Sequence, residues 1–145
     1  MKSKSFINQA NKNATRNFDA KKLDPIQTIL LRYGISTVRE REIYHDKFET
    51  KNKIRVPDLI DTRYNIIFEH DTVKVHCELG FEVVENDRDR HRIRTRNRNG
   101  DYKRAGINFV VINEDLCKEL NLDESKLAVY LYYHKLMEIK NAKQL

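Results

Sequence analysis

The sequence predicts an α/β protein with a three-layer α-β-α core, in which helices cover both faces of a central mixed β-sheet. Two observations favour this class. Helical and strand periodicities alternate along the chain in the order α-β-β-β-α-β-α. The composition, 39% hydrophobic and 34% charged over 145 residues, is typical of one soluble globular domain with its own core. No stretch is apolar for the ~20 residues that span a bilayer, so no membrane association is expected.

Residues 1–22 differ from the rest of the chain in composition. They carry six basic side chains, one acidic side chain (Asp19) and few apolar residues. Such a segment has little to bury. We therefore expect a flexible basic arm over residues 1–22, followed by a single domain over residues 23–145.

The domain begins with a helix and a hairpin. In "LDPIQTILLRYG", Asp24 is placed to cap a helix, Pro25 suits its first position, and Gly34 ends it. The apolar side chains of this segment recur at helical spacing, at Ile26, Ile29, Leu30 and Tyr33. Residues 36–60 alternate between apolar and polar types around the turn "ETKNK", which predicts a β-hairpin, and "NIIFEHD" predicts the next strand.

The last part of the chain predicts a strand and a long helix. "GINFVVINED" opens at Gly106 and is then almost continuously apolar, as a buried strand would be. "DESKLAVYLYYHKLMEIKNAK" predicts a helix that Asp123 caps. Its core-facing stripe is expected at Leu127, Tyr130, Leu131 and His134.

Between these segments lies "RDRHRIRTRNRNGDYKR", with an arginine at every second position from Arg88 to Arg98. A strand would place these arginines on one face, whereas a helix would divide them into two stripes at i,i+4 spacing. We favour a helix from about Arg88 to Ala105. The planar guanidinium group of arginine donates hydrogen bonds in a geometry that matches phosphate oxygens. A stretch with so few apolar residues cannot contribute much to the hydrophobic core. The expected nucleic-acid-binding residues are Arg90, Arg92, Arg94, Arg96, Arg98, Lys103 and Arg104.

Three carboxylates stand at the ends of neighbouring predicted strands. Asp58 follows Pro57, while Glu69 and Asp71 share one face of the next strand because side chains alternate. If the two strands are adjacent, all three converge at one sheet edge. Hard oxygen ligands of this kind suit Mg²⁺ or Mn²⁺. Such an ion would polarise a phosphodiester and lower the pKa of an attacking water.

This order of residues resembles the PD-(D/E)XK nuclease superfamily, which has an α-β-β-β-α-β core. The "PD" at Pro57 and Asp58 and the acid at Glu69 are similar to its motif. The stretch "FEHDTVKVH" resembles "IEvDG..H" of the very-short-patch-repair-like endonucleases, and "GDYKRAGINFVVIN" resembles their helix-then-strand stretch. The resemblance covers about residues 24–115.

The resemblance implies a role for each of these side chains. Asp58 and Glu69 would be metal ligands, and Asp71 stands where the superfamily usually has its lysine. Asp71, Lys74 or His76 would then take the part of that lysine, orienting water or stabilising charge. The chain is thus expected to be a Mg²⁺-dependent (or Mn²⁺-dependent) endonuclease that hydrolyses phosphodiester bonds in DNA.

Two other classes of function fit the same residues. A non-catalytic nucleic-acid-binding protein could use the basic surface of residues 88–104 while the carboxylates are only structural. A basic adaptor that binds other proteins or a membrane surface is the third class. The net charge of +6 favours an anionic partner without identifying it.

The remaining features concern compartment and assembly. Cys77 and Cys117 show no metal-binding spacing, which is typical of two reduced thiols in a cytoplasmic protein. The helix over residues 123–143 carries more apolar surface than one side of a sheet usually covers. A homodimer through this helix would supply the two sites that cleavage of both DNA strands requires.

Overall fold

The computed structural model describes residues 21–71 and 85–143. Residues 21 and 22, predicted as the end of the arm, already belong to a helix, and the rest of the predicted arm lies outside the described residues. The first helix spans residues 21–32 of the described chain. The other elements are β1 (Thr37–Val38), β2 (Ile43–Tyr44), β3 (Ile54–Arg55), β4 (Leu59–Asp61), β5 (Ile67–Asp71), α3 (Glu85–Ala105), β6 (Phe109–Asn113), α4 (Glu114–Leu120) and α5 (Glu124–Lys143).

The main sheet has four strands in the order β1-β4-β5-β6. β4 runs antiparallel to both β1 and β5, whereas β5 and β6 are parallel, so the sheet is mixed as predicted. α3 makes the crossover between the two parallel strands. β2 and β3 form a separate antiparallel ribbon, which confirms the predicted hairpin.

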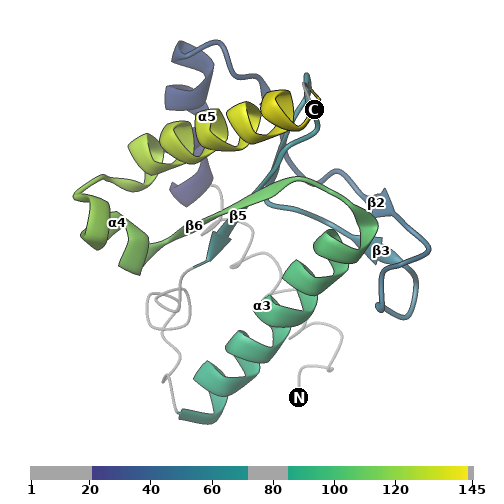
Figure 1. Cartoon of the computed structure of the whole chain (residues 1–145). Helices are drawn as coiled ribbons and strands as arrows, with labels where there is room; N and C mark the ends of the chain where they lie inside the picture. The colour runs from purple at the N-terminus through teal and green to yellow at the C-terminus, as the bar shows by residue number, and fades with distance from the viewer. Residues whose placement is uncertain (1–20, 72–84, 144–145) are drawn as a thin grey trace, which may run out of the picture.

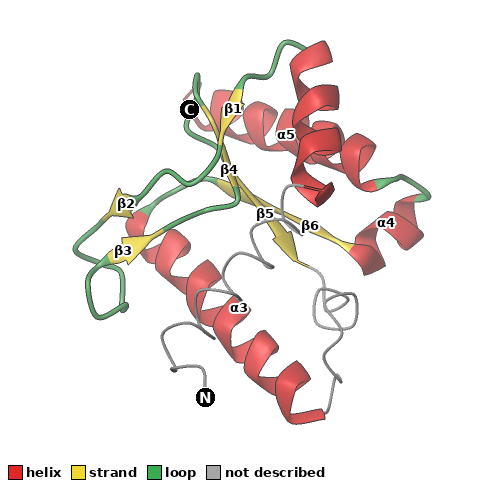
Figure 2. Cartoon of the chain, turned by 180° about the vertical axis from the view of Figure 1, so that it is seen from behind, coloured by secondary structure: helices red, strands yellow, loops and turns green. Residues whose placement is uncertain are grey.

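The helices form two layers around this sheet. In Figures 1 and 2, α3 lies on one side of β5 and β6, and α5 lies on the other side with the helix of residues 21–32. Each face has its own core. On the α5 face, Leu30, Phe68 and Tyr132 are buried together, and on the α3 face Ile67 and Tyr102 are buried together. The predicted three-layer α-β-α class is therefore confirmed.

The first helix ends as predicted but starts earlier. Gly34 has φ +77°, and the bonds from its N–H to Leu31 O and from Ile35 N–H to Leu30 O close the helix with a left-handed residue. The predicted start at Pro25 is wrong, because the helix already includes residue 21. The Asp24 carboxylate pairs with Arg39.

The arginine-rich segment is one continuous helix, and Gly100 does not interrupt α3. The prediction of a helix over this stretch is confirmed. β6 differs from the continuously buried strand that was predicted, because only Val110 and Ile112 are fully buried and the strand forms an edge of the sheet. The short helix α4 was not predicted. It begins where the Asn113 side chain accepts from Leu116 N at 2.7 Å.

The C-terminal helix is capped as predicted, because Asp123 Oδ1 accepts from Lys126 N at 2.8 Å. Its predicted core stripe is correct at Leu127, which is buried, and at Leu131, which packs against the core. It is wrong at Tyr130, which is 42% exposed, and at His134, which is also exposed. The fully buried side chains of α5 are Leu127, Ala128, Tyr132 and Leu136. The helix is rotated because Tyr132 stacks on Phe68 of the sheet, with ring centroids 5.9 Å apart.

Candidate functional site

The two acidic side chains predicted to hold a metal ion, Asp58 and Glu69, meet beneath helix α3. In the antiparallel pair β4–β5, Leu59 is opposite Phe68, so Asp58, one residue before β4, stands opposite Glu69. The carboxyl groups of Asp58 and Glu69 are close enough for each to influence the pKa of the other. Asp58 Oδ2 also accepts a bond from the backbone N of His70 at 2.7 Å. The sheet register therefore holds the pair in place.

Burial and mutual repulsion make this pair retain a proton. Burial, reinforced by the charge of Asp58, raises the pKa of Glu69 to about 8. Burial also raises the pKa of Asp58, although the hydrogen bond from His70 N opposes the shift. Two carboxylates in one low-dielectric site cannot both ionise easily. Near neutral pH the pair therefore retains a proton, which the raised pKa places on Glu69.

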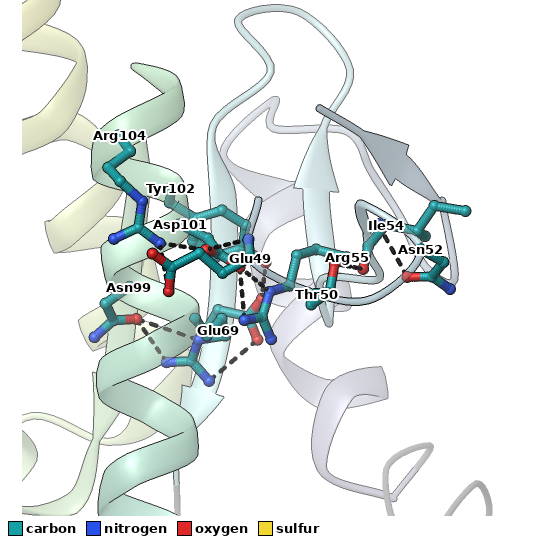
Figure 3. A network of polar contacts seen from close by, with 11 residues as sticks. Glu49, Thr50, Asn52, Ile54, Arg55, Glu69, Asn99, Asp101, Tyr102 and Arg104 are labelled. Atoms are coloured by element: carbon teal, nitrogen blue, oxygen red, sulfur yellow. Dashed lines mark hydrogen bonds and ion pairs between the residues drawn. The ribbon is translucent and has the colours of Figure 1, made fainter. Parts of the chain in front are cut away.

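Helix α3 supplies the other partners of Glu69. Arg98 and Tyr102 are four residues apart, so both side chains lie on the helix face that covers β5. The Tyr102 hydroxyl donates to Glu69 Oε1 at 2.8 Å, and Arg98 Nη1 lies 3.6 Å from Glu69 Oε2. Figure 3 shows Glu69 beside Tyr102 and Asn99 of this helix. Each Glu69 oxygen thus has a defined neighbour from α3.

A second polar cluster fastens the β2–β3 ribbon to the same helix (Figure 3). Asp101 is completely buried and accepts from Glu49 N at 2.9 Å and from Arg55 Nε at 2.8 Å. Arg104 also pairs with Asp101. Burial acts to raise the pKa of Asp101, but the hydrogen bonds from Glu49 N and Arg55 outweigh it and lower the pKa. Asp101 is therefore an ionised anchor that joins α3 to the β2–β3 ribbon.

The third predicted carboxylate, Asp71, does not join the pair. It lies two residues beyond Glu69 on the same face of β5 and contacts His91 Nε2 of α3 at 2.5 Å. Within residues 21–71 and 85–143, no three His, Cys, Asp or Glu side chains are grouped so that they could hold one metal ion. Of the three carboxylates expected to converge, the structure brings two together.

His70 points away from this site to the opposite face of the sheet. Its Nε2 lies 2.9 Å from Glu124 Oε2 at the start of α5. Burial lowers the pKa of His70, but the carboxylates of Glu124 and Asp58 outweigh that effect and raise it. His70 thus ties β5 to α5 through its side chain and supports Asp58 only through its backbone.

The predicted nucleic-acid-binding residues divide into three groups around α3. Arg98 and Arg104 turn toward the protein, where they pair with Glu69 and Asp101. Two others, Arg90 and Arg94, are exposed to solvent. The remaining three, Arg92, Arg96 and Lys103, line a cavity of about 430 Å³ on one flank of the helix. The regular arginine repeat therefore serves both the acidic pair and the outer surface.

Lys74 and His76, the other candidates for the lysine role, lie outside the described residues, as does Cys77. No protein-family model, curated protein or solved structure matches this chain. None of the helices that the structure describes is long and apolar enough to cross a membrane.

Sequence reasoning missed three residues that shape the site: Tyr102, Asp101 and His91. The i,i+4 spacing of Arg98 and Tyr102 was a usable signal, since a tyrosine on a strongly charged helix marks the face that packs. Asp101 gave no comparable signal in the sequence. Nothing local links it to Arg55, because the two residues are 46 positions apart.

Proposed function

We propose that this chain is a metal-dependent nuclease of the PD-(D/E)XK type that hydrolyses phosphodiester bonds in DNA. The observation that carries the proposal is the pair of half-buried Asp58, just before β4, and buried Glu69 on the adjacent strand β5, beneath an arginine-rich helix. A carboxylate pair under a cationic surface is the arrangement needed to bring a metal ion and a phosphodiester together.

The pair has the chemistry to hold Mg²⁺ or Mn²⁺. Both residues offer hard oxygen ligands, and Mg²⁺ is commonly bound by one or two carboxylates together with water and substrate phosphates. A divalent cation bound between the two carboxyl groups would displace the proton that burial favours on Glu69. When bound, the ion would polarise a phosphoryl oxygen and lower the pKa of a coordinated water.

The chain's own residues prepare this site. Tyr102 holds Glu69 Oε1, and the backbone N–H of His70 holds Asp58 Oδ2, so each carboxylate is fixed in direction. Arg98 places a permanent positive charge beside the pair, where charge develops on a phosphate during cleavage. Asp101 anchors the helix that carries Arg98 and Tyr102.

DNA would lie along the outer side of α3. Arg90 and Arg94 are exposed there, and the net charge of the chain is +6. Phosphate contacts of this kind position a duplex without reading its sequence. The proposed substrate is therefore the DNA backbone, with the scissile phosphate delivered to the edge where Asp58 and Glu69 meet.

A direct test is cleavage of plasmid, linear duplex, single-stranded DNA and RNA in the presence of Mg²⁺, Mn²⁺ or EDTA. We expect metal-dependent cleavage by the wild type and loss of cleavage in Glu69→Gln and Asp58→Asn. Glu49→Gln is the matched control, because that side chain is a mostly exposed carboxylate on the rim of the same region. Full cleavage by Glu69→Gln would contradict the site, and cleavage in EDTA would contradict the role of the metal.

The competing function is non-catalytic binding of nucleic acid. It is favoured by the contact of Asp71 with His91, which occupies the carboxylate expected to complete the site. On this reading the Asp58–Glu69 pair only joins the sheet to α3. Salt-sensitive binding of duplex DNA, without cleavage under any of the metal conditions above, would select this function.

The assembly proposal concerns the surface of α5. Tyr130, Tyr133 and Met137 follow one another at helical spacing and are 42%, 41% and 62% exposed. Leu31 and Tyr33 of the first helix are also exposed, and the Tyr133 hydroxyl lies 3.4 Å from Tyr33 O. An apolar patch of this kind marks a protein interface. We propose a second copy of the chain as its partner, since a dimer would present one site to each DNA strand.

A further inference from the structure

The flank of helix α3 holds a cavity that the acidic pair does not use. Its volume is about 430 Å³, within the range of small-ligand pockets. Arg92, Arg96, Asn99 and Lys103 line it from the helix, at spacings that keep them on one side. Asp71 closes it from the end of β5.

The lining is rich in hydrogen-bond donors. Arg92, Arg96 and Lys103 are permanent cations, and arginine presents a planar fork that fits phosphate oxygens. Asn99 Oδ1 accepts from Arg98 at 3.2 Å and 3.0 Å, which turns the amide NH₂ away from Arg98 and leaves it as a donor.

Among the described residues that line the cavity, the one carboxylate is already paired. Asp71 Oδ1 contacts His91 Nε2, and His91 itself belongs to the cavity wall. The acid is thus turned to the histidine, and the cationic side chains of Arg96 and Lys103 line the same cavity. A cavity with this balance of charge suits an anion with several acceptor oxygens, which is the chemistry of a phosphate group.

The position of the cavity relates it to the acidic pair. Asp71 and Glu69 are two residues apart on one face of β5, which corresponds to ~7 Å along the strand. A B-form strand carries one phosphate per ~3.4 Å of helix axis. The cavity therefore lies close enough to the place where Asp58 and Glu69 meet for both to contact phosphates of one DNA strand.

We propose that this cavity is a phosphate-binding subsite, which holds a phosphate of the DNA strand that flanks the scissile bond. The identity of the strand rests on the proposed nuclease function, but the binding of phosphate does not require cleavage. The bound group is either an internal phosphodiester or a terminal phosphate where the strand ends. His91 and Asp71 act as positioning residues, because they keep the carboxylate directed away from the anion.

The test compares variants by thermal unfolding in EDTA, with inorganic phosphate titrated against sodium chloride at equal ionic strength. Phosphate should stabilise the wild type, and Arg92→Ala and Arg96→Ala should each weaken its binding about tenfold, as expected for loss of a charged hydrogen bond. Arg32→Ala is the matched control, since it removes an exposed arginine of the first helix, outside this lining and outside the proposed DNA-binding residues. Equal effects of all three substitutions, or no stabilisation of the wild type, would overturn the subsite.

Whether the bound group is a terminal or an internal phosphate is tested by measuring the binding of a short oligonucleotide that carries a 5′-phosphate, a 3′-phosphate or neither. A terminal phosphate in the cavity predicts tighter binding of one phosphorylated form by the wild type and no such gain in Arg96→Ala. Equal binding of all three forms, still weakened by Arg96→Ala more than by Arg32→Ala, indicates an internal phosphodiester. Phosphate binding in a protein that cleaves nothing would retain the subsite and reject the nuclease. If the wild type cleaves DNA but the cavity variants bind phosphate as well as the control variant does, the nuclease is retained and the subsite is rejected.

Discussion

The proton retained on Glu69 predicts that the metal-free protein becomes less stable as the pH rises from about 5 to 8. Glu69 has a pKa of about 8 in the folded protein and an ordinary value of 4.5. Between these values the folded state holds a proton that the unfolded state has released. The free energy of unfolding therefore falls with pH, by ~1.4 kcal/mol per pH unit where the difference is complete.

Glu69→Gln isolates this contribution. The glutamine amide can donate to Asp58 and accept from the Tyr102 hydroxyl, so it imitates the protonated acid without titrating. Near pH 5 the variant should match the wild type. Near pH 8 it should be the more stable of the two by up to about 5 kcal/mol, a ceiling that structural relaxation and entering water would reduce.

Urea unfolding of both proteins in EDTA, at each pH unit from 5 to 9, measures this difference. The quantity to compare is the free energy of unfolding of the variant minus that of the wild type, because other groups such as His70 titrate in both proteins. Glu49→Gln, a substitution of an exposed carboxylate, should follow the wild-type curve. A difference between Glu69→Gln and the wild type that stays constant with pH would refute the retained proton.

Four further outcomes are expected. Tyr102→Phe removes the donor to Glu69 Oε1 and should destabilise the protein by about 1–2 kcal/mol in urea unfolding, with no loss if that bond is unimportant. Asp101→Asn should lower stability by about 2 kcal/mol or more and free the β2–β3 ribbon, which hydrogen exchange would detect; unchanged protection there would argue against the anchor. Arg90→Ala should reduce the slope of log affinity against log salt on duplex DNA by ~0.9, and an unchanged slope would exclude a phosphate contact. Met137→Lys should convert a dimer to a monomer in light scattering, whereas a wild type that is already monomeric at high micromolar concentration would end the dimer proposal.

The sequence alone determined the features that depend on neighbours along the chain. Gly34 ends the first helix because a left-handed residue is needed there, and the Asp123 side chain caps α5 by accepting from the backbone N–H of Lys126, three residues on. The alternation around "ETKNK" predicted the β2–β3 hairpin, and the arginine repeat was correctly read as helix. Local rules were sufficient for the order of the elements and for the fold class.

Only the tertiary structure decided which side of each element faces inward. The start of the first helix was missed because Asp24 finds Arg39, 15 residues away, as its partner. The buried stripe of α5 was partly misplaced because stacking of Tyr132 on the sheet, and not the apolar spacing, sets the rotation of the helix.

The candidate site shows the same division. The residue types at Asp58 and Glu69 predicted an acidic pair, but its geometry depends on the register of β4 and β5. The sequence divided the alternating arginines into two helical stripes, but only packing turned Arg98 onto Glu69 and left Arg96 in a separate cavity. Asp71 left the expected triad because His91, 20 residues further along the chain, lies across from it on α3. Contacts between residues distant in sequence carry no local signal, so the pairing of charges was determined by the fold.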